Sequence, residues 1–160
     1  MPGKTVSESA VSTSHIMYPQ DTNPAGNVQG GVIVRLLDIT AGVVATRHTR
    51  GNVVTASIDR VDFHSPVFPG DMVTFKASLN QVGKTSMEVG VRVETETVLT
   101  GYKRHTASAY VTMVSLDKNG KPAEVPPLIL ETEEDKRRNR DAQARRELRL
   151  LERQKKKYVQ

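Results

Sequence analysis

The sequence of 160 residues contains no cysteine and no tryptophan. Without cysteine, disulfide bridges and zinc sites built on thiolates are both excluded. No apolar run approaches the roughly 18 residues that span a membrane, and the first 14 residues are small and polar, unlike a secretory signal. We therefore expect one cytoplasmic domain without membrane contact.

Acidic residues are too few to balance the basic ones, and the net charge is +5. Residues 131–160 carry 11 Lys and Arg against 7 Asp and Glu, whereas the preceding 130 residues carry 12 against 11. The basic excess therefore belongs to the tail, where acids are interleaved and Tyr158 is the only aromatic residue. This pattern favours a solvated helix over a nucleic-acid interface, and we expect no nucleic-acid partner.

The composition divides the chain into three parts. Residues 1–14 are expected to be a flexible N-terminus. Residues 15–130 hold nearly all the apolar content and form the domain, and residues 131–160 form a charged helical tail after Pro126-Pro127. Within the tail, a thin apolar stripe is wide enough to dock on a neighbour but too narrow for a core; it consists of Ala144, Leu148 and Leu151.

The domain is expected to combine one long helix with an antiparallel sheet. From about Gly30 to His48, apolar residues would cover most of the circumference of a helix, which predicts a buried helix. Alternating β-favouring runs predict strands at Val53–Phe63, Met72–Val82, Ser86–Leu99 and Thr106–Leu116, with a short edge strand around His15–Tyr18. Because no βαβ alternation occurs, the fold class is α+β, one helix wrapped by one antiparallel sheet.

The start of the predicted helix carries the strongest chemical signal. Gly30 and Gly31 would expose backbone N–H groups at the positive end of the helix, where an oxyanion can bind. Asn27 can donate through its amide, and Asp38, two turns further on, can act as a general base. In the alternative interpretation, Asn27 only caps the helix and Asp38 forms a buried salt bridge.

Other polar residues give weaker signals. His48, at the end of the helix, is most simply a favourable charge on the C-terminal dipole. His15 and His105 have no partner at metal-ligand spacing, so no metal site is expected. The basic and hydroxyl side chains of Lys84-Thr85-Ser86 follow Gly83 in a turn that either holds a phosphate or is simply solvated.

At this point a family resemblance becomes visible. The sequence resembles the hotdog-fold acyl-CoA thioesterases, in particular the cytosolic acyl-CoA hydrolase group, over about residues 15–135. The matching segments are Ala25-Gly26-Asn27-Val28-Gln29-Gly30-Gly31, Leu37-Asp38-Ile39-Thr40-Ala41-Gly42, Ala45-Thr46-Arg47-His48, Val54-Thr55-Ala56-Ser57-Ile58-Asp59-Arg60-Val61-Asp62-Phe63, Gly70-Asp71, Gly83-Lys84-Thr85-Ser86-Met87-Glu88-Val89, Gly120-Lys121-Pro122 and Val125-Pro126.

The resemblance implies a homodimer with active sites at the interface, commonly assembled as a trimer of dimers. It assigns Asn27 to the thioester carbonyl and Asp38 to the role of base or nucleophile, each site taking one residue from either protomer. It also implies that acyl-CoA is the substrate and that no cofactor is needed. The residues expected to contact CoA are Lys84, Thr85 and Ser86 in the turn, and Ser57, His64 and Ser65 beside the pantetheine arm.

Two other functions stay open at this stage. A hotdog protein can bind acyl-CoA as a sensor without hydrolysing it, although no helix-turn-helix pattern precedes the domain. A hotdog dehydratase would need a histidine paired with a carboxylate, and His64 is the plausible candidate for it.

Overall fold

The computed structural model describes residues 1–158. Along the chain the elements are β1 (Lys4–Thr5), α1 (Val6–Ser9), β2 (Val11–Ile16), a 3-10 turn (Pro19–Asp21), α2 (Gly30–Thr49), β3 (Asn52–Phe63), β4 (Met72–Val82), β5 (Ser86–Thr97), β6 (Tyr102–Leu116), β7 (Leu128–Ile129) and α3 (Glu133–Lys157). Within residues 1–158, no helix combines the length and the apolar character that crossing a membrane requires.

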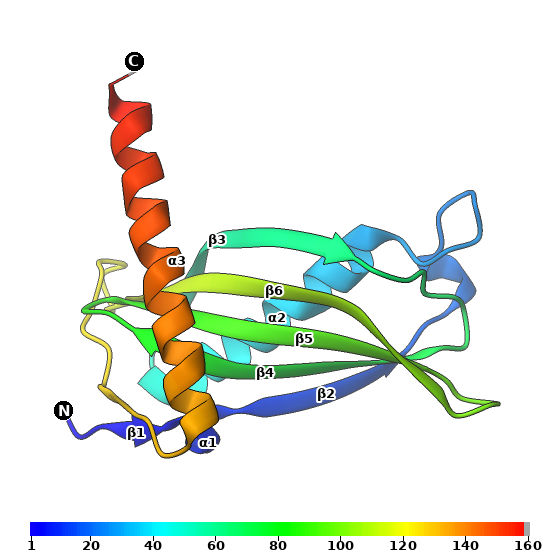
Figure 1. The fold of residues 1–160 in the computed structure, drawn as a ribbon, viewed down its shortest axis with the longest axis horizontal. Helices are drawn as coiled ribbons and strands as arrows, with labels where there is room; N and C mark the ends of the chain where they lie inside the picture. The colour runs from blue at the N-terminus through cyan, green and yellow to red at the C-terminus, as the bar shows by residue number, and fades with distance from the viewer. Residues whose placement is uncertain (159–160) are drawn as a thin grey trace.

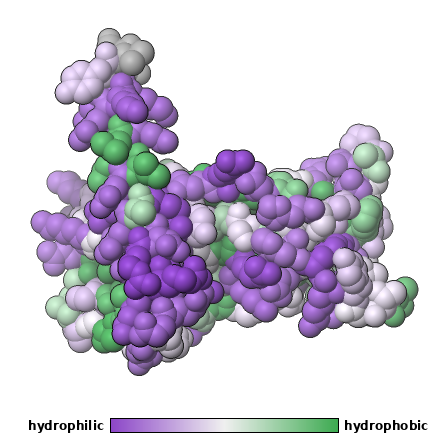
Figure 2. All heavy atoms as spheres, in the orientation of Figure 1, coloured by the Kyte–Doolittle hydropathy of each residue, from purple (hydrophilic) through white to green (hydrophobic). Residues whose placement is uncertain are grey.

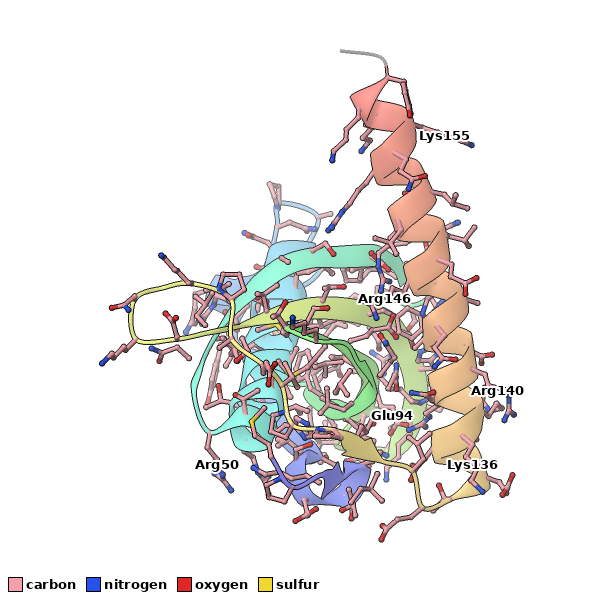
Figure 3. All side chains as sticks on the ribbon, turned by 90° about the vertical axis from the view of Figure 1, so that its left-hand side faces the viewer. Arg50, Glu94, Lys136, Arg140, Arg146 and Lys155 are labelled. Carbon is pink, nitrogen blue, oxygen red and sulfur yellow. The ribbon has the colours of Figure 1, made fainter. Side chains whose placement is uncertain are left out.

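One antiparallel sheet, in the order β2-β4-β5-β6-β3, forms the centre of the molecule (Figure 1). The long helix α2 lies against one face of the sheet, and α3 crosses the opposite face (Figure 3). The predicted α+β class, with one long helix packed on an antiparallel sheet, is thereby confirmed. β2 and β3 are the edge strands of this sheet.

The core lies between α2 and the inner face of the sheet. Ile33, Leu37, Ala41 and Val44 of α2 are almost completely buried, against strand residues such as Phe75. The opposite side of α2 is not covered, because Ile39 is 51% and Val43 is 41% exposed. The expectation of a buried helix, apolar around most of its circumference, is therefore wrong at Ile39 and Val43 in the isolated chain.

The N-terminal segment is ordered structure, which corrects the expectation of a flexible residues 1–14. β2 pairs with β4 from Val11 to Ile16, so the edge strand begins four residues before His15 and ends at Ile16. Half-buried and exposed residues alternate along β2, since one side of this edge strand faces solvent. The exposed side accounts for the polar composition that concealed the strand in the sequence.

The charged tail forms the helix α3, which begins at Glu133 after the N-cap residue Thr132, whose side-chain oxygen accepts a hydrogen bond from the N–H of Asp135. α3 docks through Ala142, which is fully buried, and through arginines that reach a carboxylate on the sheet. Arg145 and Arg149 both contact Glu88, whose exposure is 1%, at 2.7 and 3.2 Å. The docking face of α3 is therefore polar.

Candidate functional site

The first turn of α2 presents unused backbone donors. The N-cap residue of α2 is Gln29, whose side chain makes no capping hydrogen bond, so Asn27 is not the cap that the alternative interpretation required. Both Gly30 and Gly31 are exposed. Within the described part of the chain, no hydrogen bond from either glycine N–H to an acceptor outside the helix occurs. Such donors carry partial positive charge and suit a developing oxyanion.

A cavity of about 320 Å³ opens beside this helix start. It gathers residues from the loop before α2, from α2 itself and from the end of β3. Its lining consists of Asn23, Asn27, Val28, Gly30, Ile33, Phe63, His64, Ser65, Pro66 and Val67. The structure thus brings together four of the residues expected from the sequence, Asn27, Gly30, His64 and Ser65.

Asn23 is a cavity residue that the sequence reasoning missed. Its Oδ1 accepts hydrogen bonds from the backbone N–H groups of Ala25 (3.0 Å) and Asn27 (3.2 Å), and its own N–H donates to the Asn27 carbonyl (2.8 Å). These bonds fix the orientation of the carboxamide. Among residues 1–158 its Nδ2 group has no hydrogen-bond acceptor, so this amide is held rigidly with its donor end available.

Asp38 lies outside this cavity, further along α2. It is half-buried, and its Oδ1 accepts a 2.6 Å hydrogen bond from the Thr55 hydroxyl on β3. Within residues 1–158 it takes part in no ion pair, so the buried salt bridge of the alternative interpretation is absent. Thr55 is a second residue that the sequence reasoning missed, because 17 positions separate it from Asp38.

His64 and Ser65 sit where β3 ends. The His64 ring lies 5.1 Å from that of His105, and its backbone N–H donates to the Thr106 carbonyl at 2.8 Å. The Ser65 hydroxyl is buried and has no hydrogen-bond partner within residues 1–158. A hydroxyl left without a partner beside a cavity is available to a ligand group.

The remaining residues expected to contact CoA lie elsewhere in the chain. Ser57 is paired with Thr112, and Thr112 with Glu88, in one row across the sheet. Since opposite residues of adjacent strands share a face, Ser57 lies on the side covered by α3 and away from the cavity. The turn that contains Lys84 and Thr85 joins β4 to β5 at the end of the sheet opposite the start of α2 (Figure 1).

His48 is not part of the site, and its expected role as a charge on the helix dipole is wrong. It is fully buried, and its Nε2 lies 2.8 Å from the Pro126 carbonyl. Burial lowers the pKa of His48 below its ordinary value of 6.5, against the opposing effect of the Pro126 hydrogen bond. The ring is therefore a neutral donor that holds the segment before α3.

Comparison with known sequences places these features in context. A sequence model of the thioesterase superfamily matches residues 25–102. The chain is 41% identical over 143 residues to the cytosolic acyl coenzyme A thioester hydrolase of Rattus norvegicus, covering 88% of this chain but 38% of the rat protein. It is also 41% identical over 128 residues to an uncharacterized acyl-CoA thioester hydrolase of Bacillus subtilis, covering 80% of this chain and 74% of that protein.

Solved structures agree in fold over nearly the whole chain. The acyl-CoA hydrolase from Bacillus cereus is 40% identical with a TM-score of 0.91, covering 98% of this chain and 96% of that one. An apo-hexameric acyl-CoA thioesterase is 38% identical with a TM-score of 0.91, covering 95% and 97%. The acyl-CoA hydrolase of Staphylococcus aureus, in complex with butyryl coenzyme A and coenzyme A, is 35% identical with a TM-score of 0.90, covering 99% and 96%.

The Staphylococcus aureus protein was also solved as three alanine variants. They replace an asparagine, an aspartate 15 positions later, and a threonine 17 positions after the aspartate. In the present chain, Asn23, Asp38 and Thr55 have this residue type and this spacing.

Proposed function

This chain belongs to the thioesterase superfamily and, within it, to the acyl-CoA thioester hydrolases, and from that membership we propose that it hydrolyses acyl-CoA to a free acid and CoA. Its fold is the hotdog fold that the resemblance implied. The chain spans about two fifths of the rat relative, so the activity is argued from its own residues. The observation that carries the proposal is the arrangement on α2. The start of this helix has no side-chain cap and lies beside the fixed side-chain amide of Asn23, and the same helix carries Asp38, whose carboxylate is held by the Thr55 hydroxyl.

We propose that the thioester carbonyl binds at the start of α2. Its oxygen would accept hydrogen bonds from the N–H groups of Gly30 and Gly31 and from a side-chain amide of the cavity. Asn27 was the amide expected from the sequence, and it lines the cavity. We assign the principal role to Asn23, because its carboxamide is held by two backbone bonds and because its spacing from Asp38 matches that of the Staphylococcus aureus variants.

Asp38 cannot reach that carbonyl within one chain. Eight residues separate it from Gly30, which is about 12 Å along the helix axis. We therefore propose that each site takes its amide and helix start from one copy and Asp38 from a second copy. Exposed Ile39 and Val43 on α2 support a contact beside Asp38, and so does the unpaired outer side of the edge strand β3.

A two-fold contact between two β3 strands also bears on CoA binding. Antiparallel pairing would bring the β4–β5 turn of one copy toward the cavity of the other, because the two lie at opposite ends of each sheet. Lys84, Thr85 and Ser86 would then contact the CoA phosphates, while His64 and Ser65 contact the pantetheine arm. Ser57 lies under α3 and takes no part in this arrangement.

The proposed reaction requires no cofactor. Thr55 occupies one carboxylate oxygen of Asp38, and the other takes a proton from a water molecule as the water oxygen bonds to the carbonyl carbon. The oxyanion that forms lies at the start of α2. When it collapses, the carbon–sulfur bond breaks, and CoA leaves as a thiolate that takes up the proton. A thiol pKa of about 8.5 makes this leaving group good without an added acid.

A panel of acyl-CoA esters of increasing chain length tests the proposal and defines the acyl preference. Free CoA is detected with a thiol-reactive dye, to which a protein without cysteine contributes no background. We expect the native chain to release CoA from at least one ester. We expect Asp38→Asn to lose this activity, because the amide keeps the shape of the side chain but removes the base. Binding without release from any ester would indicate a sensor, and hydration of an enoyl-CoA would indicate a dehydratase. We place the activity in the cytoplasm, the location named for the rat relative.

A further inference from the structure

Four of the residues that line the cavity belong to one loop. Residues 64–71 join β3 to β4, and the cavity takes from this loop His64, Ser65, Pro66 and Val67. The loop lies at the same end of the molecule as the start of α2 and the hairpin between β5 and β6 (Figure 1). None of its residues belongs to a helix or a strand, so contacts with other elements must fix its position.

Arg104 of β6 fixes the middle and the end of this loop. Its Nη2 donates hydrogen bonds to the Pro66 carbonyl at 3.0 Å and to Asp71 Oδ2 at 2.7 Å. The same Asp71 oxygen accepts a hydrogen bond from the backbone N–H of Phe68 at 3.0 Å. The side chains of Arg104 and Asp71 are 13% and 7% exposed, so solvent screens their ion pair little. Hydrogen bonds of such charged groups are stronger than those between neutral groups.

The guanidinium of Arg104 is also oriented from its other nitrogen. Nη1 donates to the Thr97 hydroxyl at 3.1 Å, at the end of β5, so two elements fix the plane of the group. The start of the loop is held separately, because the His64 N–H donates to the Thr106 carbonyl. Loss of the Arg104 side chain would therefore leave His64 attached and free the residues that follow it.

The loop is bonded in turn to the segment that precedes α2. The Val67 carbonyl accepts a hydrogen bond from the backbone N–H of Val28 at 2.7 Å. Val28 is followed by Gln29, the N-cap residue of α2, whose N–H donates to the Asp21 carbonyl at 2.8 Å. The loop is thus held at Pro66 by Arg104 and at Val67 by the segment that leads into the helix start.

Ser65 lies just before these two fixed residues. Its hydroxyl, buried and without a partner within residues 1–158, is available to a ligand. We propose that Arg104 is a positioning residue, which holds Ser65, Pro66 and Val67 where the cavity receives the pantetheine arm of acyl-CoA; this role rests on the proposed function. Arg104 does not itself line the cavity in the described part of the chain, so it acts through the loop.

The hairpin that carries Arg104 offers two matched controls. Lys103, one residue earlier, is 71% exposed and lies 3.9 Å from Glu96, so Lys103→Gln removes the same charge from an exposed pair. The tip of the hairpin is apolar and lies in solvent (Figure 2), and Leu99 at this tip is 99% exposed. Leu99→Ser changes the hairpin without removing a partner of Arg104.

Steady-state kinetics with one acyl-CoA ester test the positioning role. Arg104→Gln is expected to raise KM about 10-fold and to leave kcat within about threefold, because saturating substrate still reaches Asp38 and the start of α2. Arg104→Lys keeps the charge but loses the fork of two nitrogens, so an intermediate KM is expected. Both controls should keep the native KM. A fall in kcat at unchanged KM would overturn the proposal, because it would show only a smaller folded fraction.

Thr97→Val decides the question if Arg104→Gln does not fold. It removes only the acceptor of Nη1, and we expect KM to rise about 2- to 3-fold. An unchanged KM in the folded Thr97→Val protein would contradict the positioning role.

Calorimetric titration with CoA separates this proposal from the proposed hydrolysis, since CoA carries the pantetheine arm but no thioester. Weaker CoA binding by Arg104→Gln would support the positioning role even if the native chain released no CoA from any ester. Native CoA affinity in a folded Arg104→Gln protein, with hydrolysis by the native chain intact, would refute the positioning role alone.

Discussion

Thr55 Oγ1 donates a 2.6 Å hydrogen bond to Asp38 Oδ1, which joins the edge strand β3 to the exposed side of α2. The same hydroxyl lies 3.5 Å from the Met113 sulfur, so its position is set from both sides. The bond holds one carboxylate oxygen and orients the other. Because β3 is an edge strand, the carboxylate proposed as the general base is held at the surface where a second copy is proposed to pair.

Replacing Thr55 tests this positioning role. Thr55→Val keeps the side-chain shape but removes the donor, and loss of a hydrogen bond to a charged group is expected to lower kcat about 10- to 100-fold. Thr55→Ser, which restores the hydroxyl, should recover most of the rate. Steady-state kinetics with one acyl-CoA distinguish the outcomes. A rise in KM at unchanged kcat would assign Thr55 to substrate binding instead.

The two cavity asparagines are expected to differ. Asn23→Ala removes the fixed amide donor, and loss of one oxyanion donor costs about 10²- to 10³-fold in kcat. Asn27→Ala keeps the backbone groups that bind Asn23, so a smaller loss is expected. The losses are compared by measuring single-turnover rates of the two variants, and circular dichroism confirms that both are folded. A larger loss in Asn27→Ala would return the role to the residue predicted from the sequence.

His48 should make stability depend on pH. Its folded pKa lies below the unfolded value of 6.5, so below about pH 6.5 the unfolded chain binds the proton more readily. The stability contributed by neutral His48 is therefore complete above the unfolded pKa and falls as the pH decreases through and below 6.5. Urea unfolding between pH 8 and 5 should show this decline, and His48→Gln should flatten it. An equally steep decline in His48→Gln would show that other titratable groups cause the pH dependence of stability.

Glu88 should be important for the docking of α3. It is 1% exposed and binds both Arg145 and Arg149, so Glu88→Gln leaves the partly buried guanidinium of Arg145 without its carboxylate, whereas Arg149 keeps Asp59 at 2.6 Å. Removing one partner of a buried ion pair costs about 3–5 kcal/mol. Guanidinium chloride unfolding should show the loss. Glu134→Gln, which removes an exposed partner of Arg137, is the control and should leave stability unchanged.

Local periodicity was sufficient to predict α2 and the four long strands. It predicted an edge strand around His15–Tyr18 but missed the start of β2 at Val11, because a one-sided edge strand needs few apolar residues. It also misjudged α2, because Ile39 and Val43 are apolar like the core but face outward in one chain. A sequence pattern identifies a residue that avoids water, but it does not say whether the same chain or a second copy covers it.

The candidate site was predicted only in part, because a sequence pattern does not show which residues meet in the folded chain. Asp38, Gly30 and Gly31 stand out because each is unusual within a helix. Asn23 does not, since its importance comes from two backbone donors that fix its amide and become visible only when the loop is folded. Thr55 meets Asp38 only through the packing of β3 beside α2, and that contact has no local signal in the sequence.

Exchange between two inactive variants tests the shared active site most directly. Asp38→Asn and Asn23→Ala proteins are mixed under conditions that allow subunit exchange, and native mass spectrometry confirms that mixed dimers form. Each mixed dimer would contain one intact site, so random exchange should restore about a quarter of the native rate of CoA release. Mixed dimers that stay inactive would contradict a site made from Asn23 of one copy and Asp38 of the other.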